Sequence, residues 1–380
     1  MQSFLMILVI LRKDCEVMIR YVVEKSAVAE NIARIRRQAG SAAVYAVVKA
    51  DGYGLGCARL ASLCAENGIT RFAVTADEEA QTIVRAGISW EEILMLTPVE
   101  DACRIETLCR MGVTFTVSCS DDARALSRLW YLTGQRPRAH IKIDTGMGRR
   151  GFSPQRPEAI RALYTRFPEI VFTGIYSHLC CGCDTRQTKR QYARFSKVLA
   201  AITEAGIDPG IRHLSASAGL FHHPELNLDA VRVGSALLGR IPEAARFGLR
   251  PTGRCYVPVE QVRELPRGAT VGYGAGYKTH RPVLAATCPI GARNGFGLVR
   301  RAGRLSLRKR VRSLLRTLMT RLTGRGTLYA TVHGTACPVL GTVGTETVVL
   351  DVSRAACKRG DEAVFDVNPL LLSHARVEFL

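Results

Sequence analysis

The stretch Val44-Tyr-Ala-Val-Val-Lys49-Ala-Asp-Gly-Tyr53-Gly-Leu-Gly56 joins a short apolar run to a glycine-rich turn. It opens a series of eight apolar runs, most of them separated by polar segments with helical character. Short strands that alternate with helices predict βα units and a parallel sheet. Eight units over about 200 residues favour an α/β fold of the (β/α)₈ TIM-type barrel, with a doubly wound fold as the alternative. The runs are Val44–Val48, Arg71–Val74, Ile93–Leu96, Val113–Val117, His140–Ile143, Val171–Tyr176, Ile211–Leu214 and Ala230–Val233.

Polar residues stand where these runs end. The carboxyl ends of the strands in a barrel converge on one face, so side chains distant in sequence meet there. We therefore expect a lysine, a histidine, an arginine and several hydroxyls to share one site. These residues are Lys49, Thr75, Thr97, Ser118, Lys142 with Asp144, His178, Ser215 with Ser217, and Arg232.

The pattern changes after about residue 245, where prolines and glycines interrupt short segments rich in valine, threonine and leucine. Such segments predict a second, mostly β domain. With 380 residues the chain is long enough for two domains. We expect a leader at 1–18, a barrel at 19–245 and a C-terminal β domain at 246–380. The leader is apolar, and Met18 is a possible native start. The strands expected in the second domain are Thr327–Val332, Cys337–Val343, Thr347–Val352 and Glu362–Val367.

The formal net charge of +20 is concentrated in one stretch. Between Glu264 and Glu346 there are fourteen basic residues and no acidic one. Within the insertion 296–326, Val311, Leu314, Leu315, Leu318 and Leu322 share one helical face, and arginines occupy much of the remainder. We interpret residues 300–325 as a basic amphipathic helix that packs on the β domain. The alternative for this helix is contact with a membrane surface or with nucleic acid. For the protein as a whole we expect no nucleic-acid partner.

The thirteen cysteines indicate reduced thiols in a cytoplasmic protein, because they are scattered and no secretory signal precedes them. The cluster Cys180-Cys181-Gly-Cys183 follows His178 and superficially suggests a metal site. It lacks a second CxxC or HxxxH pair, so we expect no metal.

Lys49 ends an apolar strand, where burial disfavours the charged form of its amine. Such a lysine is suited to a Schiff base or to the role of a base. The glycines behind it let backbone amides approach an anion. The spacing Gly52-x-Gly54-x-Gly56 lacks the GxGxxG pattern of dinucleotide binding.

Two motifs resemble signatures of the alanine racemase family, the barrel-fold enzymes that depend on pyridoxal 5′-phosphate (PLP). Val47-Val-Lys49-Ala-Asp-Gly-Tyr53-Gly resembles the family's PLP-lysine motif. His140-Ile-Lys142-Ile-Asp144-Thr-Gly-Met-Gly-Arg149 resembles its second signature. The resemblance runs from about Tyr21 to the C-terminus, in both domains.

The resemblance implies a two-base racemisation of alanine, in which one base removes the α-proton and the other returns a proton to the opposite face. Lys49 and Tyr273 would be the two bases, with Tyr273 supplied across a homodimer. Lys142 would be the lysine that is carbamylated in many members. Arg149 and Thr345 would lie on the substrate side. The implied PLP-binding residues are Lys49, Tyr53, His178, Ser217, Arg232, Gly234 and Ser235.

Structural alternatives exist for several of these residues. Lys49 could be a surface lysine, His178 a core histidine and Tyr273 a turn residue. Arg232 could serve an ion pair, and Lys142 could be unmodified.

The substrate side departs from the family pattern. Ala216 replaces the usual asparagine, Gly291–Gly295 lacks the entryway tyrosine, and Thr345-Glu346 replaces a Met-Asp pair. A tyrosine found near the C-terminus of many members is missing around Ser373–Arg376. The expected function is alanine racemisation that supplies D-alanine for peptidoglycan. A racemase of serine or another small amino acid, and a PLP-binding protein without turnover, are the alternatives.

Overall fold

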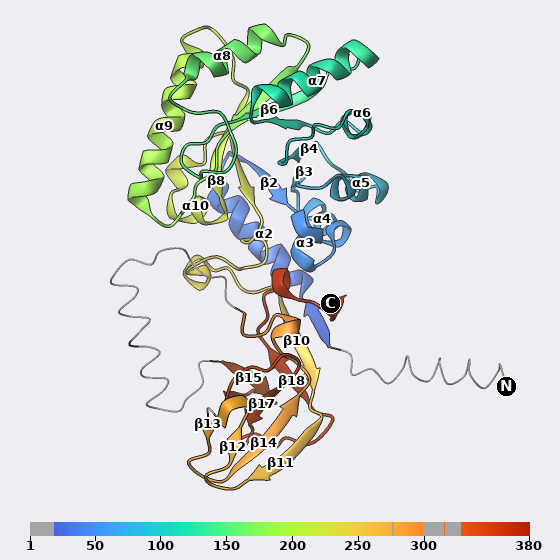
Figure 1. Cartoon of the computed structure of the whole chain (residues 1–380), viewed down its shortest axis with the longest axis vertical. Coiled ribbons are helices and arrows are strands. Elements are labelled where there is room, and N and C mark those ends of the chain that lie inside the picture. Colours follow the sequence, from blue (N-terminus) through green and yellow to red (C-terminus); the bar gives the residue numbers. More distant parts are fainter. Residues whose placement is uncertain (1–18, 276, 299–314, 316–327) are drawn as a thin grey trace, which may run out of the picture. The chain divides into compact units, whose positions relative to one another are not determined.

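The computed structural model describes residues 19–275, 277–298, 315 and 328–380. The leader and nearly all of the basic insertion, including the predicted amphipathic helix, lie outside the described residues. The chain divides into two compact units (Figure 1). We call residues 25–252 the barrel unit, and residues 19–24 with the described part of 253–380 the β unit.

Eight parallel strands form the barrel unit, in the spatial order β4-β3-β2-β9-β8-β7-β6-β5. A single bridge between Leu94 and Thr114 joins the two outer strands, so the barrel is nearly closed. Each predicted apolar run overlaps one observed strand, which confirms the barrel over the doubly wound alternative. The strands are β2 (Ala43–Val47), β3 (Arg71–Val74), β4 (Glu92–Met95), β5 (Phe115–Val117), β6 (Arg138–Lys142), β7 (Val171–Tyr176), β8 (Ile211–Ala216) and β9 (Ala230–Val233).

Helices surround these strands, as Figure 1 shows. Helix α2 buries Val28, Ile32 and Ile35 at intervals of three and four residues, which is the amphipathic pattern expected of a helix on a sheet. The helices are α2 (Lys25–Ala39), α3 (Lys49–Gly54), α4 (Cys57–Glu66), α5 (Asp77–Arg85), α6 (Ala102–Arg110), α7 (Ser120–Thr133), α8 (Pro157–Arg166), α9 (Thr185–Thr203) and α10 (Ser217–His222). The 3₁₀ turns are η1 (Pro224–Leu226) and η2 (Ala244–Phe247).

Two strand-to-helix turns use the same device. The Glu79 carboxylate, at the third position of α5, accepts hydrogen bonds from the backbone N–H groups of Thr75 (2.8 Å) and Ala76 (3.1 Å). The Asp122 carboxylate accepts in the same way from Ser118 and Cys119 at the start of α7. An acidic side chain that binds the amides before a helix fixes where the strand ends and the helix begins.

The β unit contains a nine-stranded sheet in the order β11-β14-β17-β16-β15-β18-β10-β1-β19 and a small two-stranded sheet, β12-β13. Strands β15–β18 overlap the four that were predicted, whereas β10 to β14 and β19 were missed. The strands are β1 (Arg20–Val23), β10 (Gly253–Pro258), β11 (Gln261–Leu265), β12 (Thr270–Val271), β13 (Tyr277–Lys278), β14 (Val283–Cys288), β15 (Tyr329–Val332), β16 (Thr335–Leu340), β17 (Val348–Asp351), β18 (Glu362–Phe365) and β19 (Arg376–Phe379). The 3₁₀ turns are η3 (Tyr273–Ala275), η4 (Ala292–Asn294) and η5 (Pro369–Leu371).

The two compact units divide between residues 24 and 25 and between 252 and 253, whereas a barrel over 19–245 was expected from the sequence. Strand β1 pairs antiparallel with β10 and parallel with β19, so it belongs to the β unit. Its Arg20 also forms ion pairs with Glu362 and Glu378 of that unit. The barrel unit continues to Thr252, because Asn31 on α2 binds the backbone of Leu237 and Arg250.

Candidate active site

A cavity of about 590 Å³ lies where the carboxyl ends of the barrel strands meet. It gathers residues from β2, β6, β7, β8 and β9 and from the segments that follow β2, β3, β4, β6, β7, β8 and β9. Of the strand-end residues, Ser118, Asp144 and Ser215 are absent from its lining; Ser118 binds Asp122, Asp144 binds amides of its own loop and Ser215 binds the carbonyl of Leu226. Nine of the eleven site residues that the family resemblance implies line it: Lys49, Tyr53, Lys142, Arg149, His178, Ser217, Arg232, Gly234 and Ser235.

Lys49 begins an unusual turn directly after strand β2. Ala50, Asp51, Gly52 and Tyr53 all have φ between 49° and 62° and ψ between 33° and 58°, so they form a left-handed turn. This conformation costs a residue with a side chain roughly 1–2 kcal/mol, and three of the four residues are not glycine. The turn places Lys49 at its start and Tyr53 at its end, and both side chains line the cavity.

Neighbouring elements hold this turn. The Asp51 carboxylate accepts a hydrogen bond from the backbone N–H of Cys57 (2.7 Å), at the start of α4. The Asp51 N–H in turn donates to Glu79 (3.4 Å), the same side chain that binds the amides after β3. Lys49 is therefore positioned by contacts that reach beyond its own loop.

One end of the cavity consists of backbone and hydroxyl groups. The Ser217 hydroxyl accepts hydrogen bonds from the N–H groups of Gly234 (3.0 Å) and Ala236 (3.2 Å). A Cβ atom at Gly234 would lie 2.1 Å from the Tyr53 hydroxyl, so only glycine fits there. Hydroxyls and backbone amides at a glycine-lined wall are the groups that bind phosphate.

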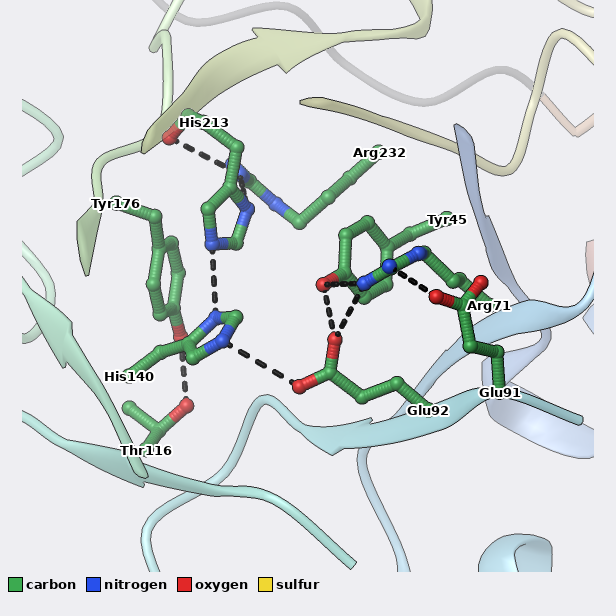
Figure 2. Close-up of polar contacts among 9 residues, drawn as sticks. All are labelled: Tyr45, Arg71, Glu91, Glu92, Thr116, His140, Tyr176, His213 and Arg232. Atoms are coloured by element: carbon green, nitrogen blue, oxygen red, sulfur yellow. Dashed lines mark hydrogen bonds and ion pairs between the residues drawn. The ribbon is translucent and has the colours of Figure 1, made fainter. Parts of the chain in front are cut away.

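Arg232 is almost completely buried at the floor of the cavity (Figure 2). Its guanidinium donates to Nδ1 of His213 (2.6 Å) and to the carbonyl of Ser177 (2.5 Å). It also lies over the ring of Tyr176, 4.8 Å from the centroid. Burial lowers the pKa of Arg232 to about 10, which still leaves the group charged at neutral pH.

Lys142 lies in a strongly cationic environment. Its side chain is buried, and its amine is 5.7 Å from the centre of the Tyr176 ring. Burial, together with Arg149 and Arg232, lowers the pKa of Lys142 to about 8. A substantial fraction of a lysine with that pKa is uncharged near neutral pH, and the uncharged amine is the nucleophilic form.

The loop that carries Arg149 is organised by Asp144. One carboxylate oxygen accepts from the N–H groups of Gly146, Met147 and Gly148, and the other accepts from the N–H of Arg149. Burial opposes ionisation of Asp144, but these bonds outweigh it and lower its pKa. A carboxylate bound by four amides fixes a glycine-rich loop at the rim of the site.

His178 is neutral in this cavity. Burial and the nearby cations, Arg232 first among them, lower its pKa to about 3. Its Nδ1 lies 3.4 Å from Nη2 of Arg232 and accepts from it, since guanidinium groups only donate. His178 therefore offers the cavity an uncharged ring.

The sequence analysis did not select every residue that lines the site. Tyr176, the last residue of β7, carries both Lys142 and Arg232 on its ring. Its position at a strand end is the signal that could have identified it. Arg150 and Cys180 also line the cavity. No group of three or more histidine, cysteine, aspartate or glutamate residues in the described part of the chain has the geometry of a metal site.

Tyr273 and Thr345 lie in the β unit, so their roles at the site stay predictions. Tyr273 is 87% exposed, although it is a large aromatic side chain. The backbone N–H of Arg293 donates to the carbonyl of Thr345 (2.9 Å), and the Arg293 side chain forms an ion pair with Glu346 (2.6 Å). The departures from the family motifs at 291–295 and 345–346 are thus neighbours in space.

A (β/α)₈ barrel with two lysines, three arginines and a wall of hydroxyl and amide groups at the carboxyl ends of its strands, joined to a β unit, is the architecture of a two-domain barrel enzyme. The sequence matches two family models, "Alanine racemase, N-terminal domain" over residues 23–242 and "Alanine racemase, C-terminal domain" over 254–369. The chain therefore belongs to the alanine racemase family, whose members are isomerases.

Relatives from distant organisms agree with this assignment. The chain is 32% identical to an alanine racemase of Methanococcus maripaludis, with 87% of this chain and 84% of that protein covered. It is also 32% identical to an alanine racemase of Symbiobacterium thermophilum, with 90% and 85% covered.

Solved structures share the fold. The alanine racemase from a D-cycloserine-producing Streptomyces lavendulae superposes with a TM-score of 0.81, covering 96% of this chain and 97% of that one. The Streptomyces coelicolor enzyme gives 0.81, covering 97% and 99%. Both are 22% identical to this chain, so the likeness concerns the fold. Within the described residues, no helix combines the length and the apolar character needed to cross a membrane.

The depressed pKa of Lys142 predicts how stability depends on pH when the amine is unmodified. Between about pH 8 and pH 10.5 the unfolded chain still binds the proton that the folded protein has lost. The free energy of unfolding therefore receives a contribution from Lys142 that increases as pH rises through this window. We expect the stability difference between wild type and Lys142→Met to shift in favour of wild type over the window. Urea denaturation in CO₂-depleted buffer measures this difference in the free energy of unfolding. A difference that does not change with pH would contradict the lowered pKa of Lys142.

Proposed function

We propose that this chain is a PLP-dependent amino-acid racemase that interconverts L- and D-alanine and supplies D-alanine for peptidoglycan. The observation that carries the proposal is the shared cavity. It places Lys49 together with Arg232 and with the wall of Ser217, Gly234 and Ser235. Membership of the alanine racemase family supports the same reaction.

The cavity has the groups that PLP requires. Lys49 would attach the cofactor covalently through its amine. Ser217, Tyr53 and the amides of Gly234 and Ser235 would bind the phosphate. The missing Cβ at Gly234 leaves room for the Tyr53 hydroxyl to lie against this wall. Arg232 would face the pyridine nitrogen, and His178 would lie beside the ring.

PLP, when bound, supplies the conjugated system that stabilises negative charge at the substrate's α-carbon. The side chains of this protein would move the proton. The Lys49 amine would exchange the α-proton on one face, and the Tyr273 phenol of a second subunit would do so on the other. Arg149 would hold the substrate carboxylate, because a guanidinium matches its two oxygens. A charged Arg232 would keep the pyridine nitrogen unprotonated, which moderates the withdrawal of electrons and restrains side reactions.

A product assay tests the proposal. The full-length protein is incubated with PLP and either L-alanine or L-serine, and chiral chromatography measures each enantiomer. We expect D-alanine to form faster than D-serine. Faster formation of D-serine would favour the altered substrate side, Ala216, Ala292 and Thr345, as the determinant of specificity. Binding of PLP with no D-product from any small amino acid would overturn the racemase assignment.

Lys142 is expected to carry a carbamate, formed when its uncharged amine attacks CO₂ with loss of one proton. The low pKa of Lys142 supplies that amine, and the surrounding Arg149 and Arg232 would stabilise the anion that results. In ¹³C-bicarbonate buffer we expect one carbamate resonance from wild type and none from Lys142→Arg. An identical spectrum from both proteins would show that Lys142 is unmodified.

A further inference from the structure

The barrel interior beneath the cavity is polar. Small barrels are usually filled by branched apolar side chains, so this composition calls for an explanation. Figure 2 shows these side chains, which are joined by polar contacts or ring stacking. Each of the eight strands contributes one: Tyr45 from β2, Arg71 from β3, Glu92 from β4, Thr116 from β5, His140 from β6, Tyr176 from β7, His213 from β8 and Arg232 from β9.

Four of these groups form a continuous relay, which we define as Arg232, His213, His140 and Glu92. Nη1 of Arg232 lies 2.6 Å from Nδ1 of His213. Nε2 of His213 lies 3.0 Å from Nδ1 of His140. Nε2 of His140 lies 3.4 Å from Oε1 of Glu92. Every member is at least nine-tenths buried, so water does not substitute for these contacts.

The relay has one direction, which follows from the chemistry of its two ends. A guanidinium only donates, so Nδ1 of His213 must accept and its proton resides on Nε2. That proton is donated to Nδ1 of His140, whose own proton therefore also resides on Nε2. The Nε2–H of His140 then faces Oε1 of Glu92 at 3.4 Å, outside hydrogen-bond geometry, and neither of these two buried atoms has a hydrogen-bond partner in the described part of the chain. An ionised carboxylate can only accept from it. An imidazolium at either histidine would place two donors against each other.

The electrostatics of the groups agree with this direction. Burial opposes ionisation of Glu92, but His140, through hydrogen bonding and through its positive charge when protonated, and the Tyr45 hydroxyl outweigh burial and lower the pKa of Glu92 to about 2. Burial and the charge of Arg232 keep the pKa of His213 well below its ordinary value. The relay is thus a cation and an anion joined by two neutral imidazoles.

Packing keeps both rings in place. His213 is stacked between Tyr176 (ring centroids 4.8 Å apart) and Tyr45 (5.5 Å apart). A Cβ atom at Gly174 on β7 would lie 2.7 Å from Nε2 of His140, so the absence of a side chain there makes room for the ring. The rings are held edge to face, with their centroids 5.0 Å apart.

Glu92 is anchored from the far side. Its Oε2 accepts from the Tyr45 hydroxyl and from Nη1 of Arg71 (3.1 Å). Arg71 also pairs with Glu91, which is exposed to solvent. Oε2 is therefore held by two donors, and Oε1 is left facing Nε2 of His140 at 3.4 Å.

We propose that Glu92 is a positioning residue for Arg232, acting through His140 and His213. By facing the Nε2–H of His140, Glu92 selects the Nε2-protonated tautomer of both imidazoles, while the donor Arg232 at the other end keeps His213 neutral. Arg232 then meets an acceptor on its buried side and keeps its charge and its orientation toward the cavity. The inference rests on the proposed function only for the identity of what Arg232 faces, the pyridine nitrogen of PLP.

Glu92→Gln removes this anchor with little change in shape. The amide has one acceptor oxygen, and three donors converge on Glu92. If the amide N–H₂ faces His140, the tautomers of both histidines must reverse and a donor is turned toward Arg232. If the oxygen faces His140, the amide N–H₂ meets Arg71. Glu91→Gln is the matched control, because Glu91 is adjacent, contacts the same Arg71 and lies outside the relay.

Histidine ¹⁵N NMR of the full-length protein, with and without added PLP, tests the relay directly. In wild type and Glu91→Gln we expect both His140 and His213 to show neutral rings protonated at Nε2. In Glu92→Gln we expect the His213 signals to change although Glu92 does not touch His213. We also expect the Kd for PLP to rise about tenfold or more, as is typical when a supporting residue is lost.

Gly174→Ala gives a second, independent break, because the added methyl displaces His140 and leaves Glu92, Arg71 and Tyr45 intact. It serves if Glu92→Gln does not fold. If the His213 signals of the folded variant are the same as those of wild type, both with and without PLP, the relay is overturned. The NMR signals do not depend on turnover, so a protein that shows them but racemises nothing would contradict the proposed function alone.

Discussion

Replacing Lys49 with alanine is expected to abolish racemisation, with a loss of activity of at least about 10³-fold. Lys49 is proposed both to attach PLP and to exchange the α-proton on one face. The cavity holds one other lysine, Lys142, which is embedded among Arg149 and Arg232 and is proposed to be modified. The visible absorbance of covalently attached PLP should disappear in the same variant.

Borohydride reduction followed by peptide mass spectrometry tests the attachment of PLP to Lys49 without relying on turnover. In wild type the reduced cofactor should be found on the peptide that contains Lys49, and in Lys49→Ala on no peptide. Lys189→Ala is a suitable control, since Lys189 is exposed on α9, outside the cavity. Racemisation by Lys49→Ala at a rate close to that of wild type would refute the assignment.

Tyr273→Phe is expected to have the second largest effect, a loss of about 10²–10⁴-fold in kcat. Phenylalanine retains the ring and removes only the hydroxyl that exchanges the proton. The side chain is 87% exposed in the single chain, so its hydroxyl is accessible to a second subunit. Tyr329→Phe, half-exposed in the same unit, is the control.

A mixed dimer tests whether Tyr273 acts across the interface. Subunits that carry Lys49→Ala are combined with subunits that carry Tyr273→Phe, and heterodimers are isolated with two different tags. If Tyr273 serves the other subunit, one site of the two contains both Lys49 and Tyr273 and activity returns. If it serves its own subunit, neither site is complete and the heterodimer stays inactive.

The sequence was informative about the barrel because each strand there is a continuous apolar run with a polar residue at its end. Lys49, Lys142 and Arg232 could be selected on this basis, and they line one cavity. The β unit was less predictable. Strand β1 has its partners more than 200 residues away in β10 and β19, and nothing in its local composition identifies them.

Some features of the site could not be predicted, for a different reason. Glu92 and His213 lie inside strands that are otherwise apolar, and their role depends on which rings meet across the barrel. The neighbouring residues in the sequence indicate that such side chains are buried. They do not identify the partners, which come from strands far apart in the chain. Contacts of this kind can be identified only when the pairing and register of the strands are known.

The left-handed turn after Lys49 has a consequence for the order of events during synthesis. Three residues with side chains do not adopt this conformation locally, so the turn needs support from Cys57 and Glu79, which are made later. In the emerging chain Lys49 is thus an ordinary flexible lysine. Its amine reaches its position in the cavity only when β3 and α5 have packed against the turn. The reactivity proposed for Lys49 therefore depends on completed folding of this part of the barrel.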